Sequence, residues 1–468
     1  MQELPLQIDI NMNLEKKKVV VVGLGKSGEA ATTLLAGQGA DVLVVDDEKA
    51  KPPASLTQIK SDIPIRFKLG HFDNEDLLSS EMVVVSPGVP LSRLPMAALK
   101  AVEIPVIGEM ELASRFLVAP IIAITGTNGK STTTTLTAEI LKESGFKVFV
   151  GGNLGTPLSS AVFRSFDFIV VEVSSFQLET IETFRPKIAA LLNVTEDHQD
   201  RHGNMETYRK LKERIFENQR RVDYAVLNAD AFPPIPLFPS SYPNTCKGIP
   251  IWFSRSGDPL YPRQGVTLIK DTLISSITGK EDPIVGVKGI KLVGSHNLEN
   301  VMAAVTIALL AGASHSAILK TLAQFSGLPH RMEMVRELKG VRYINDSKGT
   351  NVGAVLKSLE GINSSVILIA GGLDKGSDFT PLQEIVFKKV KRLILMGEAI
   401  EKLAACFKGH PAIDRVHSME EALLLASASA NKGDVVLLSP GCASFDMFNN
   451  YEHRGDVFKK AVMGLCQI

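Results

Sequence analysis

The sequence has no excess of charge of either sign, because Lys and Arg together number 51 and Asp and Glu together also number 51. A chain without a net field is not drawn as a whole to nucleic acid or to an anionic membrane. A highly charged substrate therefore has to be bound by local sites. We expect neither nucleic acid nor a membrane as a partner.

Cysteine is also scarce, with four residues scattered at Cys246, Cys406, Cys442 and Cys466 and no CxxC spacing. This argues against a disulfide framework and a structural zinc site, and it is typical of a reducing compartment. Long apolar runs are missing, since no segment approaches the roughly 18 uncharged apolar residues of a membrane span. The first residues lack the pattern of a signal peptide. We expect a soluble cytoplasmic protein.

The chain is long, at 468 residues, so two or three domains are expected rather than one hydrophobic core. Short runs rich in Val and Ile alternate with helical patterns along almost the whole length. Such runs are typical of parallel strands that are buried on both faces. The fold class is therefore α/β. The predicted strands are Val19–Gly23, Val42–Val45, Met82–Val85, Ile121–Ile124, Phe168–Val173, Ile188–Leu192, Val366–Ile369, Arg392–Leu395 and Val435–Leu438.

Three blocks divide the chain, and their expected bounds are 1–108, 109–327 and 328–468. A helix over Glu109–Phe116 connects the first two blocks, and Gly327–Arg331 is a candidate hinge before the third. The Pro-rich stretch Phe232–Pro262 is expected to form surface loops and short antiparallel strands. We expect Rossmann-like first and third domains around a central P-loop ATPase-like domain with a parallel sheet.

A glycine-containing loop follows the Ile121–Ile124 strand and precedes a helical run over Thr133–Glu143. Backbone N–H groups freed by glycine, together with a helix N-terminus, form a cradle for phosphate. Lys130 then reaches the terminal phosphates, and Ser131 supplies a hydroxyl ligand for Mg²⁺. Ile124 stands where the pattern GxxxxGK[ST] has its first glycine, so the alternative is a chance turn. The predicted nucleotide-binding residues are Gly126, Thr127, Asn128, Gly129, Lys130, Ser131 and Thr132.

Two side chains that suit Mg²⁺ follow other predicted strands. Glu172 ends the strand Phe168–Val173, and His198 follows Ile188–Leu192. Both would open onto the carboxyl edge of the sheet, where ligands bind in doubly wound folds. A carboxylate and an imidazole suit a cation that offsets phosphate charge. Each residue could equally be a hydrogen-bonded structural one, and the sequence leaves that alternative open.

The N-terminal block contains Gly23-Leu24-Gly25-Lys26-Ser27-Gly28 after a strand, with Asp46 at the end of the next strand. This is the pattern of a dinucleotide-binding turn with an acidic ribose partner, which makes a dehydrogenase the rival hypothesis. The same turn binds any diphosphate, including that of a UDP-sugar. A second nucleotide loop at Lys130 disfavours the dehydrogenase, because hydride transfer does not need a triphosphate.

The loop GTNGKST, with Glu172–Leu178 and Asn193–His198 downstream, resembles the Mur ligases of peptidoglycan synthesis. The resemblance extends from the Gly23 region to the Arg454 region, and folylpolyglutamate synthase is a more distant relative that shares the loop. It implies an ATP-dependent carboxylate–amine ligase that uses two Mg²⁺ ions. The non-ligase alternative is a nucleotide switch, which gives no reason for a metal cluster or a third domain.

The resemblance also implies roles for single residues. Catalytic roles fall on Lys130, Glu172, His198 and Lys212, and metal ligation on Ser131, Glu172, His198 and Lys212. Lys212, four residues after Tyr208, matches a lysine that is carbamylated in similar ligases. By spacing alone, the basic helix Glu206–Arg214 is a solvated face with i,i+4 pairs. The loop between Asp200 and Tyr208 is one residue shorter than is usual in such ligases.

Further nucleotide contacts implied by the resemblance are Asn297, Asn300, Arg331 and Asp346. By itself, an Asn at position 297 is more often a helix cap. The residues implied for the UDP-linked substrate are Lys26, Ser27, Asp46, Gly88, Asn153, Ser174 and Gln177. Asp47 and Glu48 stand where relatives often have Thr and Arg.

The stretch SPGCASFDMFNNYEHRG and the separate Lys375 resemble the members of the family that add D-glutamate. The Asp-Asn-Pro-Arg motif of the diaminopimelate- or lysine-adding members is absent. The implied substrates are UDP-N-acetylmuramoyl-L-alanine and D-glutamate, handled by a monomer. Another amino acid, or a folylpolyglutamate-type reaction, is the alternative. The candidate amino-acid-binding residues are Lys348, Thr350, Lys375, Ser444 and Tyr451.

Overall fold

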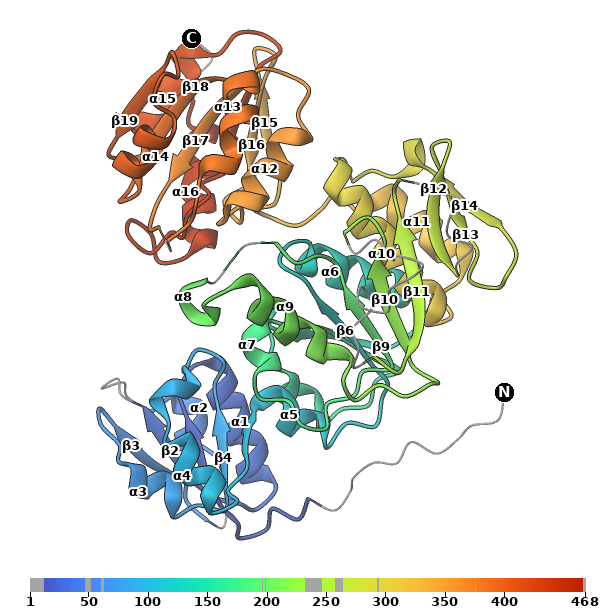
Figure 1. Cartoon of the computed structure of the whole chain (residues 1–468), viewed down its shortest axis with the longest axis vertical. Helices are drawn as coiled ribbons and strands as arrows, with labels where there is room; N and C mark the ends of the chain where they lie inside the picture. The colour runs from blue at the N-terminus through green and yellow to red at the C-terminus, as the bar shows by residue number, and fades with distance from the viewer. Residues whose placement is uncertain are drawn as a thin grey trace.

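The computed structural model describes residues 12–465 except 47–51, 60–62, 196, 198, 232–245, 257–263, 293 and 375. These residues form three sheets, which follow one another along the chain. Figure 1 shows the first sheet (blue) and the third sheet (orange to red) at opposite ends of the molecule, with the central one between them.

The first sheet has the strand order β3-β2-β1-β4-β5, and every pair in it is parallel. Its valine-rich strands are buried on both faces, as their sequence predicts; β1 reads KVVVV with only the lysine exposed. The strands are β1 (Lys18–Val22), β2 (Asp41–Asp46), β3 (Arg66–Leu69), β4 (Met82–Val85) and β5 (Val106–Gly108), and the helices are α1 (Lys26–Gly37), α2 (Ala54–Thr57), α3 (Asn74–Leu78), η1 (Leu91–Arg93) and α4 (Met96–Ala101).

The central sheet has the order β14-β13-β12-β11-β10-β9-β6-β8-β7. It is parallel from β7 to β12, while β12, β13 and β14 are antiparallel. Its strands are β6 (Ile121–Thr125), β7 (Val148–Gly152), β8 (Phe168–Glu172), β9 (Ile188–Leu191), β10 (Tyr224–Asn228), β11 (Ile249–Ser254), β12 (Gly265–Ile269), β13 (Thr272–Ser275) and β14 (Asp282–Gly286).

One prediction for this sheet is wrong. The described part of Phe232–Pro262 forms β11, which pairs in parallel with β10 rather than antiparallel. The antiparallel strands come later, at β12 to β14. Trp252 lies on β11 and is 8% exposed. The surrounding helices are α5 (Glu109–Ser114), α6 (Lys130–Glu143), η2 (Leu158–Ala161), α7 (Ser175–Leu178), α8 (Gln199–His202), α9 (Met205–Glu213), η3 (Arg214–Phe216), η5 (Val287–Gly289), α10 (Ser295–Leu310) and α11 (His315–Gln324).

The third sheet has the order β15-β16-β20-β17-β18-β19, with an antiparallel edge pair β15–β16 and parallel pairs elsewhere. Its strands are β15 (Glu333–Leu338), β16 (Val341–Asn345), β17 (Val366–Gly371), β18 (Val390–Met396), β19 (Ile413–Val416) and β20 (Val435–Leu438). Its helices are α12 (Val352–Glu360), η6 (Thr380–Leu382), α13 (Gln383–Lys389), α14 (Ile400–Cys406), α15 (Met419–Ser429) and α16 (Tyr451–Met463).

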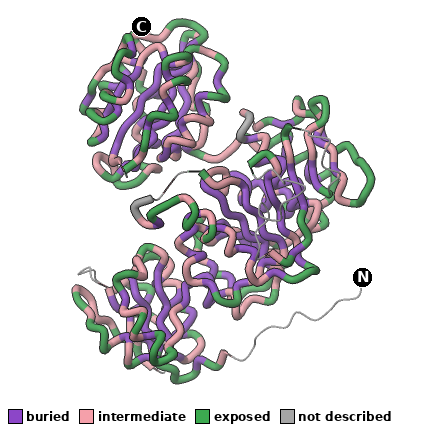
Figure 2. Tube along the Cα trace, in the orientation of Figure 1, coloured by how far each residue is buried: buried purple, intermediate pink, exposed green. Residues whose placement is uncertain are grey.

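The three sheets form the buried interior of the molecule (Figure 2). One apolar cluster runs without interruption from the first sheet into the central one and contains Leu35, Met110 and Phe184. The third sheet has two clusters of its own, one on each face. In the part of the chain that the structure describes, no helix combines the length and apolarity that crossing a membrane requires.

Candidate functional site

The phosphate loop lies between the fully buried strand β6 and helix α6, as predicted. Gly126 and Gly129 have φ values of 158° and 85°, and Gly129 is the left-handed N-cap of α6. A Cβ added at Gly129 would lie 2.1 Å from Asn300 Oδ1. Glycine is therefore required at this position both for conformation and for space. The result is a tight turn at the N-terminus of a 14-residue helix, which suits an anion.

The Lys130 side chain lies over the loop that precedes it. Its Nζ donates hydrogen bonds to Gly126 O (2.8 Å) and Thr127 O (2.9 Å). Burial lowers the pKa of Lys130, against the effect of the nearby Glu172 carboxylate. A phosphate in the loop would replace two carbonyl partners with a formal negative charge, which is a stronger partner for the ammonium group.

Ser131, in the first turn of α6, meets Glu172, the last residue of β8. Ser131 Oγ donates to Glu172 Oε2 (2.5 Å), and Asn153 Nδ2 donates to Glu172 Oε1 (2.7 Å). Arg331 from the start of the third domain donates to the same Ser131 Oγ (2.8 Å). Burial alone would raise the pKa of Glu172, but Lys130 and these hydrogen bonds outweigh it and lower the pKa. The carboxylate therefore stays ionised at neutral pH.

Two of the predicted metal ligands, Ser131 and Glu172, lie next to each other in the structure. The Ser131 hydroxyl and the Glu172 carboxylate are hard oxygen donors at one point, and they fit Mg²⁺. Among the described residues, no three His, Cys, Asp or Glu side chains gather around a common point. His198, the expected imidazole ligand, lies outside the described residues, and its role stays a prediction.

Lys212 is buried on α9 rather than exposed on a solvated face. Its side chain is 1% exposed, its Nζ donates to Gly126 O (3.0 Å), and it lies 4.6 Å from the centroid of the Tyr208 ring. Burial lowers the pKa of Lys212 well below its ordinary value. The solvated-face interpretation holds for Lys210, which forms an exposed pair with Glu206, but it is wrong for Lys212.

Tyr208 connects this lysine to a group of residues for which the sequence predicted no individual role. Thr127 Oγ1 lies 3.4 Å from Tyr208 Oη, and the Tyr208 ring stacks on His202 at 5.2 Å between centroids. His202 Nε2 lies 3.0 Å from Ser175 Oγ. Arg201 forms a 2.7 Å ion pair with Glu179. In the sequence, only the aromatic nature of His202 and Tyr208 hints at this buried stack.

The glycine turn of the first sheet has the geometry that its sequence predicts. Gly23 has a φ of 93°, and a Cβ added at Gly28 would lie 1.9 Å from Gly23 O. The Asp46 carboxylate accepts the Leu24 N–H at 2.6 Å, so it fastens the turn. Lys26 and Ser27 begin α1 beside it, and Gly88 has no atom within 4 Å of an added Cβ.

Three other residues predicted to bind the UDP-linked substrate have partners within the protein. Ser174 and Gln177 form a reciprocal capping box at the start of α7, with the Gln177 N–H donating to Ser174 Oγ (3.2 Å). Asn153 donates to Glu172, as described above. These contacts place Asn153 next to the phosphate loop, and whether the three side chains also meet a substrate stays a prediction.

A cavity of about 360 Å³ lies between the central and third domains. Phosphate-loop residues, Asn297 and Asn300 line it from one side, and Arg331, Asp346 and Lys348 line it from the other. Asn297 is not a helix cap, because α10 begins after Gly294 without a side-chain cap. Asn300 Nδ2 instead lies 3.4 Å from Asn297 Oδ1. The structure thus brings predicted residues from both domains to one cavity.

On the third-domain side, Asp346 accepts hydrogen bonds from Ser358 Oγ (2.7 Å) and Ser439 Oγ (2.8 Å), and burial raises its pKa to about 6. Lys348 Nζ lies 3.6 Å from the centroid of the Tyr451 ring, and burial lowers its pKa to about 8. Lys348 and Tyr451, both predicted to bind the amino acid, are therefore in contact. Lys375 lies outside the described residues.

Arg454 holds the turns of the third domain together and was not predicted. It is 1% exposed and donates to the carbonyl oxygens of Ser347 (2.9 Å), Cys442 (3.2 Å) and Ala443 (3.2 Å). Burial lowers its pKa to about 10. Thr350 and Ser444, two more predicted residues, lie on the two turns that it joins. An arginine inside a helix gives no signal of this role in the sequence.

Comparisons with known proteins agree with this arrangement. Residues 17–108 match the model of the MurD-like N-terminal domain of Mur ligases, residues 124–308 the Mur ligase middle domain, and residues 330–442 the Mur ligase glutamate ligase domain. The chain is 45% identical to the UDP-N-acetylmuramoylalanine–D-glutamate ligase of Geotalea uraniireducens, over 97% of this chain and 99% of that one. It is 44% identical to the enzyme of the same name from Koribacter versatilis, over 97% and 99%. The MurF ligase of Thermotoga maritima in complex with ADP has a similar fold, with a TM-score of 0.59, 17% identity and 96% of both chains covered.

Proposed function

The chain belongs to the Mur ligase family, and from this premise we propose that it joins D-glutamate to the L-alanyl carboxylate of UDP-N-acetylmuramoyl-L-alanine, with ATP converted to ADP and phosphate. The observation that carries the proposal is the near-complete match to D-glutamate-adding ligases at 44–45% identity. The product is a precursor of peptidoglycan, and we place the reaction in the cytoplasm.

The chemistry follows from the low reactivity of a carboxylate toward an amine. The substrate carboxylate attacks the γ-phosphorus of ATP, the bond from this phosphorus to the β,γ-bridging oxygen breaks, and ADP leaves. The resulting acyl phosphate is attacked by the amine of D-glutamate, which loses a proton, and phosphate leaves as the amide forms. Lys130 and the N–H groups of the loop stabilise the charge on the transferring group.

Ser131 and Glu172 would hold Mg²⁺, with His198 and modified Lys212 as further ligands of two ions. Mg²⁺ bound there supplies positive charge against the phosphate oxygens. Arg331 donates to Ser131 across the domain boundary, and this contact supports a role for the arginine at the γ-phosphate. Domain movement about the Gly327–Arg331 segment would then control when the arginine meets the phosphate.

We propose that Lys212 carries a carbamate. The neutral amine attacks CO₂ to form an N–COO⁻ group and releases a proton, which turns a cation into a metal ligand. Burial supports this step because it lowers the pKa of Lys212 and so favours the neutral, nucleophilic amine. We expect Lys212→Ala to be inactive and not rescued by added bicarbonate. Near-normal turnover of that variant would contradict the proposal.

Within this proposal, residues 1–108 bind the uridine diphosphate at Lys26, Ser27, Asp46 and Gly88. Residues 109–327 bind ATP, and residues 328–468 bind D-glutamate through Lys348, Thr350, Lys375, Ser444 and Tyr451. The contact between Lys348 and Tyr451 supports the last assignment, since it holds a cation at a turn that opens on the nucleotide cavity. A single chain contains all three parts, which is why we propose a monomer.

The test is phosphate release with ATP and UDP-N-acetylmuramoyl-L-alanine, assayed separately with D-glutamate, L-glutamate, L-alanine and L-lysine. We expect release with D-glutamate alone. Release with folate and L-glutamate instead, and none with D-glutamate, would favour a folylpolyglutamate-type ligase. Release that requires neither acceptor would favour a nucleotide switch.

A further inference from the structure

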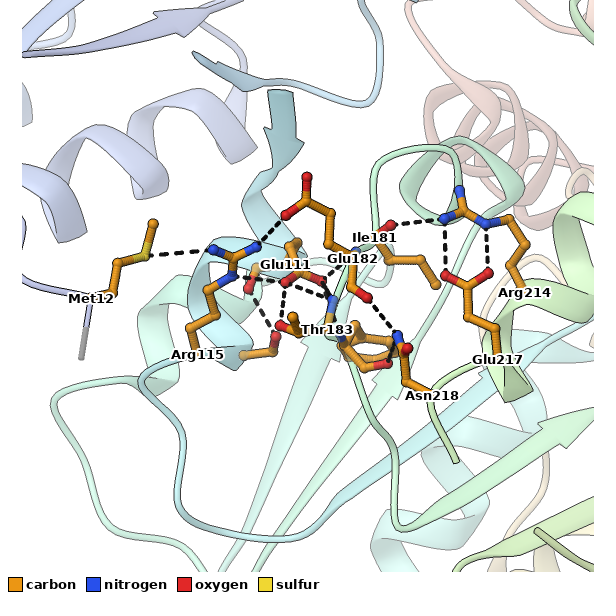
Figure 3. Close-up of polar contacts among 11 residues, drawn as sticks. Met12, Glu111, Arg115, Ile181, Glu182, Thr183, Arg214, Glu217 and Asn218 are labelled. Carbon is orange, nitrogen blue, oxygen red and sulfur yellow. Dashed lines mark hydrogen bonds and ion pairs between the residues drawn. The ribbon is translucent and has the colours of Figure 1, made fainter. Parts of the chain in front are cut away.

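The loop between α7 and β9 is held from two opposite sides by side chains (Figure 3). On one side lies Glu111, the third residue of α5. Its Oε2 accepts the backbone N–H groups of Glu182 (2.9 Å), Thr183 (3.1 Å) and Phe184 (2.8 Å). Its Oε1 accepts the Thr183 hydroxyl at 2.6 Å and Arg115 Nε at 2.8 Å. One carboxylate therefore binds three consecutive N–H groups of the loop.

On the other side of the loop, two residues bind its carbonyl oxygens. Arg214 donates to Leu178 O (2.6 Å), Glu179 O (2.9 Å) and Ile181 O (2.8 Å). Asn218 donates to Glu182 O (2.9 Å) and to Phe184 O (3.1 Å). We call the loop 178–184, with Glu111, Arg214 and Asn218, the clamp.

The clamp joins parts of the molecule that must work together. Glu111 belongs to α5, the helix of the central domain that directly follows β5 and packs against α1 of the first sheet. Gly108, the last residue of β5, also donates its backbone N–H to Thr180 O in the loop (3.4 Å). Arg214 lies two residues after Lys212, immediately after α9. The loop itself begins at the end of α7, whose first turn is capped by Ser174 and Gln177. The domain proposed to hold the UDP-linked substrate is thus tied, through one loop, to the helix that carries Lys212.

Charge and burial show that Glu111 is held strongly. Its side chain is fully buried, and burial would raise its pKa, but the Thr183 hydroxyl, the backbone N–H groups and Arg115 outweigh burial and lower the pKa. A buried, ionised carboxylate that accepts this many hydrogen bonds fixes the loop against sliding in any direction, because each contact is short and directional.

We propose that Glu111 is a positioning residue for the reaction, because it sets the distance between the UDP-substrate domain and the Lys212 and phosphate-loop region. The inference rests on the proposed function. In-line transfer needs the substrate carboxylate within van der Waals reach of the γ-phosphate, and a displacement of about 1 Å costs about 100-fold in rate. The clamp supplies that precision from outside the site, without touching substrate, nucleotide or metal.

The test is Glu111→Gln in the full-length enzyme. The amide keeps the size of the side chain but removes the charge and turns an NH₂ group toward backbone donors. We expect kcat to fall about 100-fold. ATP affinity, measured by equilibrium binding, and KM for ATP should stay within twofold of wild type, because the phosphate loop is unchanged. Glu182→Gln is the matched control: it removes the ion pair of Glu182 with Arg115 on the exposed side of the same loop and should keep wild-type kcat.

Arg214→Lys gives a second, independent measurement, because a lysine retains the charge but cannot bind three carbonyl oxygens in a planar fork. It should show the same fall in kcat with unchanged ATP affinity. A folded Glu111→Gln with kcat within twofold of wild type overturns the inference. So does loss of folding in both variants, which assigns the clamp to stability alone. If wild type shows no turnover with D-glutamate, the proposed function fails; the inference is then judged by the variant-to-wild-type ratio with whichever amino acid supports turnover.

Discussion

The two boundaries between the domains are built differently. Between the first and central domains, α1 packs against α5 and η2, and a single apolar cluster crosses the boundary. Between the central and third domains, side-chain hydrogen bonds connect the two parts: Arg331 to Ser131 at 2.8 Å and Asn351 to Asp197 at 3.0 Å. The third domain keeps separate apolar clusters.

The difference has a mechanical meaning. A large apolar contact fixes two domains, whereas a small polar one allows them to move. The segment that enters the third domain has left-handed backbone at Gly327 (φ 105°), His330 (62°) and Met332 (47°). Two of these residues carry side chains, so this conformation is costly and is maintained by contacts such as that of His330 with Asn345. We therefore expect the second boundary to be movable and the first to be fixed. The cavity of about 360 Å³ lies at the boundary expected to move, and the clamp lies at the other.

The largest effect is expected at the movable boundary. Arg331→Ala removes a cation that meets Ser131 of the phosphate loop, and we expect kcat to fall about 1,000-fold. The melting temperature should change by less than about 2 °C, since no apolar area is lost. Steady-state kinetics and calorimetry check both numbers. A large fall in melting temperature would instead make this boundary structural and break the comparison.

At the fixed boundary, the expected change is in stability. Met110 on α5 is 1% exposed within the shared cluster, and Met110→Ala should lower the free energy of unfolding by about 3 kcal/mol. Met463→Ala is the matched control, because Met463 is 64% exposed, and it should change stability by less than about 0.5 kcal/mol. Urea unfolding followed by circular dichroism measures both. Equal losses would mean that the first boundary does not depend on its core.

A pH-dependent effect is expected at Asp346. Its pKa is raised to about 6 in the folded protein, so the folded state binds the proton more tightly than the unfolded state does. Relative to Asp346→Asn, wild type should therefore lose about 1–2 kcal/mol of stability as pH rises from about 4 to about 6. Calorimetry at pH 4.5 and 7.5 tests it. A wild-type stability that instead rises relative to Asp346→Asn between pH 4.5 and 7.5 has the wrong sign.

The smallest effect is expected at Asn351. Its side chain caps α12 and donates to Asp197 across the movable boundary. Asn351→Asp keeps the cap but sets two carboxylates side by side, which should raise KM for ATP about twofold to fivefold. Asn351→Ser, which caps without charge, is the control. An effect as large as that of Arg331→Ala would show that this boundary is stiffer than its contacts indicate.

The repeating parts of the fold were predictable from the sequence because fully buried strands need unbroken apolar runs. Each of the predicted strands is present, with ends shifted by at most two residues. The hairpins β12–β14 were misplaced because their short strands lack such runs. The segment before the third domain was predicted to be a hinge because it contains glycine and proline, and that role stays a prediction. The left-handed His330 and Met332 have no signature in the sequence.

The candidate site divides in the same way. The proximity of Ser131 and Glu172 was predictable because both lie at the carboxyl ends of parallel strands, and these ends share one edge of the sheet. The burial of Lys212, the Arg454 contacts and the Glu111 clamp depend on side chains that meet from distant segments. Contacts of this kind are set by tertiary packing and not by the local sequence pattern, so they could not be predicted from one sequence.

Trp252 on β11 has a practical consequence. It is the only tryptophan in the chain, and it lies in the shared cluster of the first and central domains. Its fluorescence emission should therefore report specifically on the packing between the first and central domains. A swing of the third domain would leave the spectrum unchanged, while melting of the pair would shift it to the red. If a dye is attached to the third domain, its signal would report movement of that domain. The Trp252 emission, recorded at the same time, would report whether the first and central domains stay packed together.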